Sequence, residues 1–166
     1  GAERRGPSVF WLSATAPPFA VHTATVSDEG EVSAPVTVGD FPPEAWGWTL
    51  SAAVSGTRTA LQTGRHVMIL EGTRVVKTVY LGGFGEPSTI VAAGTNFVVS
   101  WVATGEIRIR QTLDLDGNFV GTVGGGGVAT GGLNSTLATD GETVLLAWSA
   151  DDGRNLGSPM LWERRF

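Results

Sequence analysis

Glycine turns recur along this chain at nearly constant spacing, and this recurrence constrains the fold more than any other feature. Two series of turns are centred on Gly30, Gly72 and Gly117 and on Gly56, Gly94 and Gly141. Successive members are 42 and 45 residues apart in the first series and 38 and 47 residues apart in the second. A period in this range is typical of repeat architectures, in which each module buries its faces against its neighbours. We therefore expect one module to be repeated along the chain.

The clearest copy of the module spans residues 88–120. It reads as a strand, a turn at residues 94–96, a second strand ending in Trp101, a break at residues 103–105, a third strand, a turn at residues 116–118 and a fourth strand. Asp-Gly between alternating apolar runs is a strong hairpin signal, because the turn requires a positive φ that Gly adopts without steric cost. We expect a type I′ turn there. The module is thus a four-stranded antiparallel meander, the size of a propeller blade.

The other copies are less regular. Units are expected at about residues 1–48, 49–87, 88–132 and 133–166, together forming a single β-propeller domain or a fragment of one. The first unit begins inside a module, with its second, third and fourth strands predicted at residues 7–14, 19–27 and 31–38 and a connection at residues 40–48. The last unit stops in its third strand. The predicted fold class is all-β, with about three and a half to four blades of a larger ring.

Composition narrows the classes of function. The net charge of −5 and the pI near 4.9 argue against a nucleic-acid partner, which favours a basic face. No apolar run approaches the roughly 18 residues that a membrane span requires. The absence of cysteine excludes disulfides, thiol catalysis and thiolate metal sites. Gly1 opens the chain without Met or a signal peptide, which we interpret as a processed, cleaved or partial chain.

Two polar patterns could suggest a ligand site. The glycine-rich run at residues 121–132 lacks the Lys-Ser/Thr pair of a phosphate-binding loop, so we interpret it as a linker. Asp114, Asp116 and Asn118 alternate as oxygen ligands of calcium do. No bidentate Glu follows at the distance that an EF-hand requires, and a hairpin turn explains the same residues. The turn is the preferred interpretation.

Other candidates for chemistry are weaker. His22 and His66 are 44 residues apart, one repeat, and could occupy equivalent places, but a metal needs two or three converging ligands. We expect both to be ordinary strand residues. Residues 149–153 resemble the core of the Asp-box turn of sialidase-type propellers, which is structural rather than catalytic. Tyr80 is the only tyrosine and has no arginine cluster near it in the sequence, so a sialidase is rejected.

Aromatic residues provide the one candidate contact surface. Phe41, Trp46 and Trp48 flank two prolines in the predicted connection between the first two units. They could form a platform for a sugar or a contact with a protein, since Trp combines a large apolar face with one donor. Alternatively, they fill the groove between adjacent blades, which we favour because such a groove needs bulky apolar residues. The strand tryptophans, which we expect in the core, are Trp11, Trp101, Trp148 and Trp162.

The third unit also resembles a known family. The run Ala-Ala-Gly-Thr-Asn-Phe-Val-Val-Ser-Trp at residues 92–101, with Leu-Asp-Gly-Asn at residues 115–118, is similar to the degenerate repeats of large secreted bacterial β-propeller proteins of the myxobacterial type. The resemblance covers nearly the whole chain and is best in the third and fourth units. It implies a propeller in an extracellular or cell-surface location. The second unit departs from it by lacking the tryptophan.

These observations favour recognition over catalysis. We expect a non-catalytic interaction or scaffold propeller of a secreted or cell-surface bacterial assembly, with no catalytic, cofactor or metal residues. Half a propeller ring would have strand edges with unpaired backbone groups, which can pair with another polypeptide segment. Its partners would be other protein chains or a missing part of the same polypeptide. The alternative is a carbohydrate-binding, lectin-like propeller that contacts a glycan through Phe41, Trp46 and Trp48.

Overall fold

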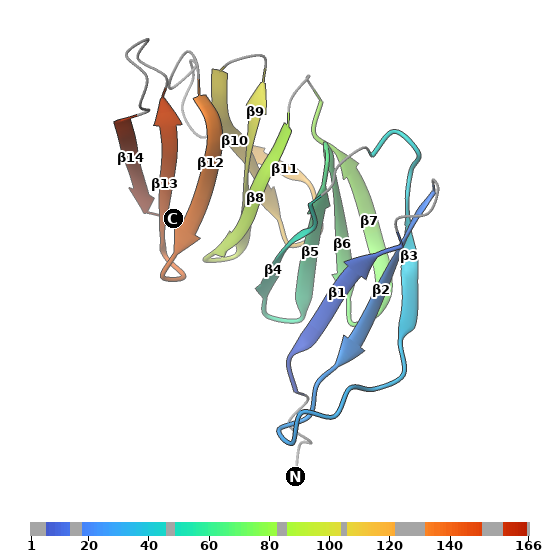
Figure 1. Cartoon of the computed structure of the whole chain (residues 1–166). Coiled ribbons are helices and arrows are strands. Elements are labelled where there is room, and N and C mark those ends of the chain that lie inside the picture. Colours follow the sequence, from blue (N-terminus) through green and yellow to red (C-terminus); the bar gives the residue numbers. More distant parts are fainter. Residues whose placement is uncertain are drawn as a thin grey trace.

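The computed structural model describes residues 6–13, 18–45, 49–82, 86–103, 106–121, 132–150 and 158–165. These residues form β-strands, turns and extended segments and contain no helix. The strands build four antiparallel sheets, which lie side by side in chain order (Figure 1). We call the sheets blades 1 to 4.

Blade 1 contains β1 (Ser8–Leu12), β2 (Phe19–Thr25) and β3 (Val36–Phe41). Blade 2 contains β4 (Ser51–Ser55), β5 (Arg58–Thr63), β6 (His66–Glu71) and β7 (Arg74–Tyr80). Blade 3 contains β8 (Glu86–Ala93), β9 (Asn96–Ala103), β10 (Glu106–Asp114) and β11 (Phe119–Gly121). Blade 4 contains β12 (Gly132–Thr139), β13 (Thr143–Ala150) and β14 (Ser158–Arg165).

Every blade is a meander, because each strand pairs with its neighbour in sequence. The first strands of successive blades lie together: β8 contacts both β4 and β12. Sheets that meet along their first strands and diverge outward have the arrangement of propeller blades, so the predicted all-β propeller fold is confirmed (Figure 1). We call β4, β8 and β12 the inner strands.

Blade 1 has no inner strand in the part of the chain that the structure describes. The connection from β2 to β3 carries Gly30, and the connection from β6 to β7 carries Gly72 of the same series. Strand β1 therefore corresponds to β5, the second strand of blade 2. It pairs with β2 and forms the edge of its sheet.

The core lies between the blades rather than inside any one of them. In β6, Val67, Met68, Ile69 and Leu70 are all fully buried. Val67 and Ile69 pack against blade 3, and Met68 and Leu70 pack against blade 1, because side chains alternate across a strand. Because both faces of β6 are buried, its sequence is a continuous apolar run. A strand with one exposed face would instead alternate apolar and polar residues. Each such side chain stabilises the fold by about 1.5–3 kcal/mol.

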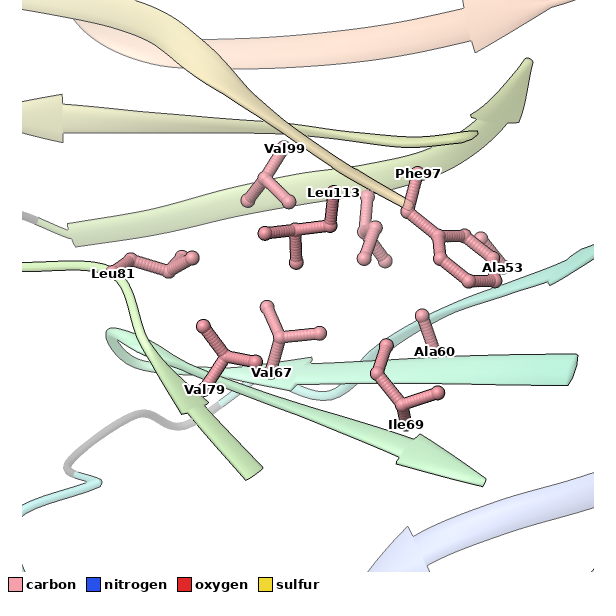
Figure 2. Packing of buried hydrophobic residues seen from close by; sticks show 10 residues of the cluster. Ala53, Ala60, Val67, Ile69, Val79, Leu81, Phe97, Val99 and Leu113 are labelled. Atoms are coloured by element: carbon pink, nitrogen blue, oxygen red, sulfur yellow. The ribbon is translucent and has the colours of Figure 1, made fainter. Parts of the chain in front are cut away.

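Figure 2 shows the contact between blades 2 and 3 at close range. Phe97, Val99 and Leu113 project from blade 3 toward Val67 and Ile69 of blade 2. All five are fully buried. The side chains interdigitate across the two sheets, so the pair of blades shares one apolar layer.

The last strand of blade 1 differs from its prediction. It was expected at residues 31–38 but runs from Val36 to Phe41, so Asp40 and Phe41 belong to β3 rather than to the connection. After the turn, the two sides are joined by an isolated bridge between Val26 and Val32 and by a hydrogen bond from the Thr25 N–H to the Ser33 hydroxyl at 3.0 Å. Pro35 has no backbone N–H to donate, and regular pairing with β2 resumes directly after it.

The turn at residues 116–118 also differs from the type I′ turn expected there. The N–H of Gly117 donates to the carbonyl of Asp114 at 3.0 Å, and the N–H of Asp114 donates to the carbonyl of Asn118 at 2.9 Å. This is a three-residue loop with Gly117 in the left-handed region at φ 77°. The side chain of Asp114 explains the difference, because its Oδ1 accepts the N–H groups of both Asp116 and Asn118.

The expectation of core tryptophans is wrong for Trp11. Its side chain is 37 % exposed, because it lies on the face of β1 opposite blade 2 and no described strand covers that face. It stacks on His22, with ring centroids 5.6 Å apart. The other three tryptophans lie on β9, β13 and β14, but their side chains are outside the described residues.

Candidate protein interface

The inner turns of blades 2, 3 and 4 are bonded to one another. They contain Gly56, Gly94 and Gly141, all with positive φ. The Ser55 hydroxyl donates to the Gly94 carbonyl at 3.2 Å, and the Gly94 N–H donates to the Gly141 carbonyl at 2.7 Å. The second glycine series of the sequence therefore marks one end of the inner strands, where each turn contacts the next.

A second set of bonds joins the inner strands themselves. The N–H of Ile90 in β8 donates to the Ser51 hydroxyl in β4 at 3.2 Å. The N–H of Leu137 in β12 donates to the Thr89 hydroxyl in β8 at 2.9 Å. Ser51 and Thr89 each stand five residues before a turn glycine, and Ile90 and Leu137 each stand four residues before one. The same bond therefore recurs at the same place of the repeat. We call this pair of bonds the inner ladder.

Blade 4 presents the next acceptor of the inner ladder on an open face. Thr136 stands five residues before Gly141, as Ser51 and Thr89 stand before their glycines, and it is exposed. On β13, Val144 and Leu146 are fully buried, while Leu145 between them is half-buried on the opposite face. We call this side, with Thr136, Ala138, Thr143 and Leu145, the forward face of blade 4.

The place of Leu145 in the repeat shows what the forward face lacks. Leu145 stands four residues after Gly141, and Val98 stands four residues after Gly94. Val98 is fully buried in blade 3, which has blade 4 beside it. Leu145 instead lines an open cavity of about 370 Å³ with Ala138, Thr139, Asp140 and Thr143. The forward face has the residues of a blade contact, and no described blade covers it.

At the other end of the array, side chains of β4 are exposed as well. Val54 of β4 is 63 % exposed and Ala52 is exposed. Their equivalents in blade 3 are Ala92, which packs against the core, and Ile90, which is 2 % exposed. The difference arises because blade 2 packs against this face of β8, whereas no described inner strand of blade 1 packs against the same face of β4.

Comparison with known proteins supports the fold. No protein-family model matches the chain, and no curated protein matches it. Solved structures match in fold alone. A structure from a study of two prolyl endopeptidases superposes on 97 % of this chain with a TM-score of 0.56 and 14 % identity. A europium-containing methanol dehydrogenase superposes on 96 % with a TM-score of 0.54 and 12 % identity.

The match to each of these structures is partial. The chain spans 23 % of the length of the first structure and 38 % of the length of the second. A WD40 domain of SCAP from fission yeast is also similar, with a TM-score of 0.48, 15 % identity and 95 % of this chain covered. At these identities, the chain shares an arrangement of sheets with the matched proteins.

Charged side chains join blades 2 and 3 at the outer turns. Arg58 of β5 contacts Asp116 of blade 3 at 3.0 Å and Glu71 of its own blade at 2.6 Å, and Arg74 of blade 2 also pairs with Glu71. Hydrogen bonds from Arg74 and Arg58 hold the pKa of the Glu71 carboxyl below its usual value. The hydrogen bond to Asp116 and the contact with Glu71 raise the pKa of Arg58.

The three residues considered as calcium ligands, Asp114, Asp116 and Asn118, either hold the outer turn of blade 3 or bond it to blade 2. Burial would raise the pKa of Asp114, but hydrogen bonds from Asn118 and Asp116 outweigh it and lower the pKa. Asp116 accepts from Arg58, and Asn118 accepts from Lys77 of blade 2 at 2.8 Å. No group of three or more potential metal ligands occurs among the described residues. The alternating oxygens hold the loop and dock it on blade 2.

The structure describes one of the three residues of the predicted aromatic platform. Phe41 is fully buried on β3, in the apolar cluster between blades 1 and 2 with Val21, Leu61 and Met68. It fills the groove between these blades, as the alternative interpretation proposed, and offers no face to a glycan or a protein. Trp46 and Trp48 lie outside the described residues.

The two histidines have separate surroundings. His22 of β2 lies against Trp11, and its Nδ1 is 3.1 Å from the Thr37 hydroxyl. His66 of β6 is buried against the ring of Tyr80, and burial lowers its pKa.

The described residues of the chain include no helix long and apolar enough to cross a membrane. The motif at residues 149–153 and the glycine run at residues 121–132 lie largely outside the described residues.

Proposed function

We propose that this chain is a non-catalytic scaffold that binds other protein chains through the open ends of its blade array, as part of a secreted or cell-surface bacterial assembly. The forward face of blade 4 is the first of these ends. The observation that supports this proposal is the equivalence of Thr136 with Ser51 and Thr89. Two of the three hydroxyls already hold a neighbouring blade by the same bond, and the third is exposed.

In this proposal, the surface of the partner is the face of another blade. Leu145 and Ala138 would pack against apolar side chains, and Thr136 would accept a backbone N–H where the partner blade carries an inner strand. A face that meets a different face on its partner makes a head-to-tail contact, which closes into a ring when the rotation allows it. A second copy of this chain offers such a face on blade 1, where Val9 and Trp11 are exposed.

Sedimentation equilibrium of the purified chain tests this proposal. We expect concentration-dependent association that Leu145→Glu abolishes, because the substitution would bury a carboxylate at the contact. The matched control is Val120→Glu on β11, where the valine is 56 % exposed and belongs to neither open end. A chain that stays monomeric, or association that survives Leu145→Glu, contradicts the proposed contact between copies.

A further inference from the structure

The contact between blades 1 and 2 encloses a histidine. Met68 and Leu70 of β6 pack against blade 1, and His66 lies on the same face of the strand, because side chains two residues apart share a face. His66 is only 5 % exposed. Blade 1 reaches this face through β3, which lies beside β7 (Figure 1), and through the turn at residues 42–45, where Ala45 is fully buried. An ionisable ring is therefore buried where two blades meet.

The groups around His66 come from both blades. Within blade 2, His66 pairs with Thr63 of β5 and with Tyr80 of β7, and the ring centroids of His66 and Tyr80 are 5.1 Å apart. Arg65 precedes His66, and its guanidinium carbon lies 5.7 Å from the centroid of the Tyr80 ring. From the side of blade 1, the turn at residues 42–45 contributes the exposed carboxylate of Glu44. These residues set the electrostatics of the imidazole.

The surroundings of His66 favour its neutral form. Among the described residues, no group hydrogen-bonds the buried Nδ1. Burial lowers the pKa of His66, and this effect outweighs the carboxylate of Glu44, which raises the pKa; the guanidinium of Arg65 lowers it further. Asp40 is the carboxylate at this end of β3. It stands next to Phe41, which faces blade 2, so Asp40 lies on the opposite face of the strand.

We propose that His66 makes the contact between blades 1 and 2 sensitive to acid, so that blade 1 separates locally from blade 2 when the imidazole takes up a proton. An enclosed imidazolium loses its hydration without gaining a hydrogen bond at Nδ1. Moving β3 and the turn at residues 42–45 away from β6 returns the ring to water. Blades 2 and 3 stay together, because the inner ladder and the contact of Arg58 with Asp116 join them. This inference does not depend on the proposed protein-binding function.

The direction and the range of the pH response follow from linkage. In the separated form, His66 is hydrated and its pKa returns to the ordinary value of about 6.5. The closed form binds the proton less readily, because burial lowers the pKa. The contact is therefore fully stable above about pH 6.5 and loses stability as the pH falls toward the pKa of the closed form. One proton changes the ratio of separated to closed form by at most about tenfold per pH unit.

Titration of the histidine rings is the first test. The chain has two histidines, so proton NMR of the full chain shows two imidazoles. We expect His66 to titrate below about pH 6.5, with the signal assigned by its persistence in His22→Phe. His22 is the matched control, since it is half-buried on β2 and its Nδ1 lies 3.1 Å from the Thr37 hydroxyl. Glu44→Gln should lower the pKa of His66 further by removing an attractive charge. A His66 ring that titrates at or above about pH 6.5 would overturn the proposal.

Hydrogen exchange is the second test, because it locates the separation. The backbone N–H groups of β3 should exchange through local opening, with a weaker dependence on urea than those of β9, since local opening exposes less surface. Corrected for the intrinsic rates, exchange in β3 should speed up several-fold from about pH 7.5 to about pH 5.5, a range above the usual pKa of Asp and Glu. The same urea dependence in β3 and β9, or no acceleration in β3, would show that blade 1 does not separate in this way.

Substitution of each histidine connects the two tests. His66→Phe keeps an aromatic ring in the contact but cannot titrate, so the acceleration in β3 should disappear, whereas His22→Phe should retain it. Acceleration that survives His66→Phe would contradict the assignment to His66. If His66→Phe does not fold, the titration and exchange of the unsubstituted chain and of His22→Phe still decide. Leu145→Glu should show the full acid response, because Leu145 belongs to the forward face of blade 4, so failure of the proposed association leaves this test intact.

Discussion

Blade 3 and blade 4 share one module, yet the same places of the module have different surroundings. Val98 in blade 3 and Leu145 in blade 4 stand four residues after their turn glycines, and only Val98 is fully buried. Blade 2 shows a similar difference within one strand, because Ala53 faces blade 3 and is buried while Val54, on the opposite face of β4, is exposed. Burial in this molecule is therefore set by the neighbour of a blade more than by the residue type.

Removing a large side chain from the shared layer should have the largest effect. We expect Phe97→Ala to lower the free energy of unfolding by about 3–5 kcal/mol, because it leaves a cavity between blades 2 and 3. The matched control is Phe119→Ala in the same blade, where the ring is 53 % exposed and the expected loss is below about 1 kcal/mol. Urea denaturation measures both. Equal losses would show that the contact between blades is not the core.

The loops at Gly30 and Gly117 give a sharper test of the contact between blades. They have the same hydrogen bonding, because the Gly30 N–H donates to the Ser27 carbonyl at 3.0 Å as the Gly117 N–H donates to the Asp114 carbonyl. Gly117 and Gly30 both have positive φ, so an alanine at either position is strained by about 1–2 kcal/mol. A Cβ on Gly117 would also lie 3.0 Å from Ile69 and 3.1 Å from Val79, whereas a Cβ on Gly30 meets nothing within 4 Å. We expect Gly117→Ala to lower the thermal midpoint clearly more than Gly30→Ala. Equal shifts would mean that the loop does not press on blade 2.

The inner ladder allows the same substitution to be made inside the array and at its end. Thr89→Val removes the acceptor of the Leu137 N–H and should destabilise the chain by about 1–3 kcal/mol. Thr136→Val changes the equivalent exposed hydroxyl and should stay within about 0.5 kcal/mol. Chemical denaturation of the two variants compares them directly. A larger loss for Thr136→Val would mean that its hydroxyl is already engaged within the chain.

The strands and turns could be predicted because their causes are local. A glycine at positive φ between alternating residues marks a turn whatever surrounds it, and Gly56, Gly94 and Gly117 all satisfy that requirement. The inner ladder was also visible in the sequence, since Ser51 and Thr89 stand at the same distance from their glycines. That signal was missed because a single hydroxyl in a strand is common and the glycine series alone defined the repeat.

The exposure of single residues could not be predicted because it depends on contacts between blades. Phe41 was assigned to a connection but pairs with Phe19 and is covered by blade 2. Trp11 ends an apolar run like that of Trp101, yet it is 37 % exposed because nothing described lies beside its face of blade 1. The type of the loop at Gly117 depends on bonds from Asp114 that the turn signal alone does not contain.

The smallest expected effect concerns the ion pairs that Glu71 makes within blade 2. The pKa of Glu71 is lower in the folded chain than in the unfolded one, because Arg74 and Arg58 hydrogen-bond its carboxylate. The folded state then binds the proton less readily, so this carboxylate stabilises the fold above its unfolded pKa and the contribution is lost as the pH falls through the folded value. Glu71→Gln should therefore lower stability slightly at neutral pH and weaken its decline in acid.

The measurement for Glu71 is the urea midpoint of the chain and of Glu71→Gln from neutral pH to about pH 3, below the usual pKa of a Glu side chain. The difference should shrink toward the acid end. It should also shrink at about 1 M salt, where the Debye length is only about 3 Å and exposed charges are screened. A difference independent of both pH and salt would mean that Glu71 acts through packing instead of through its charge.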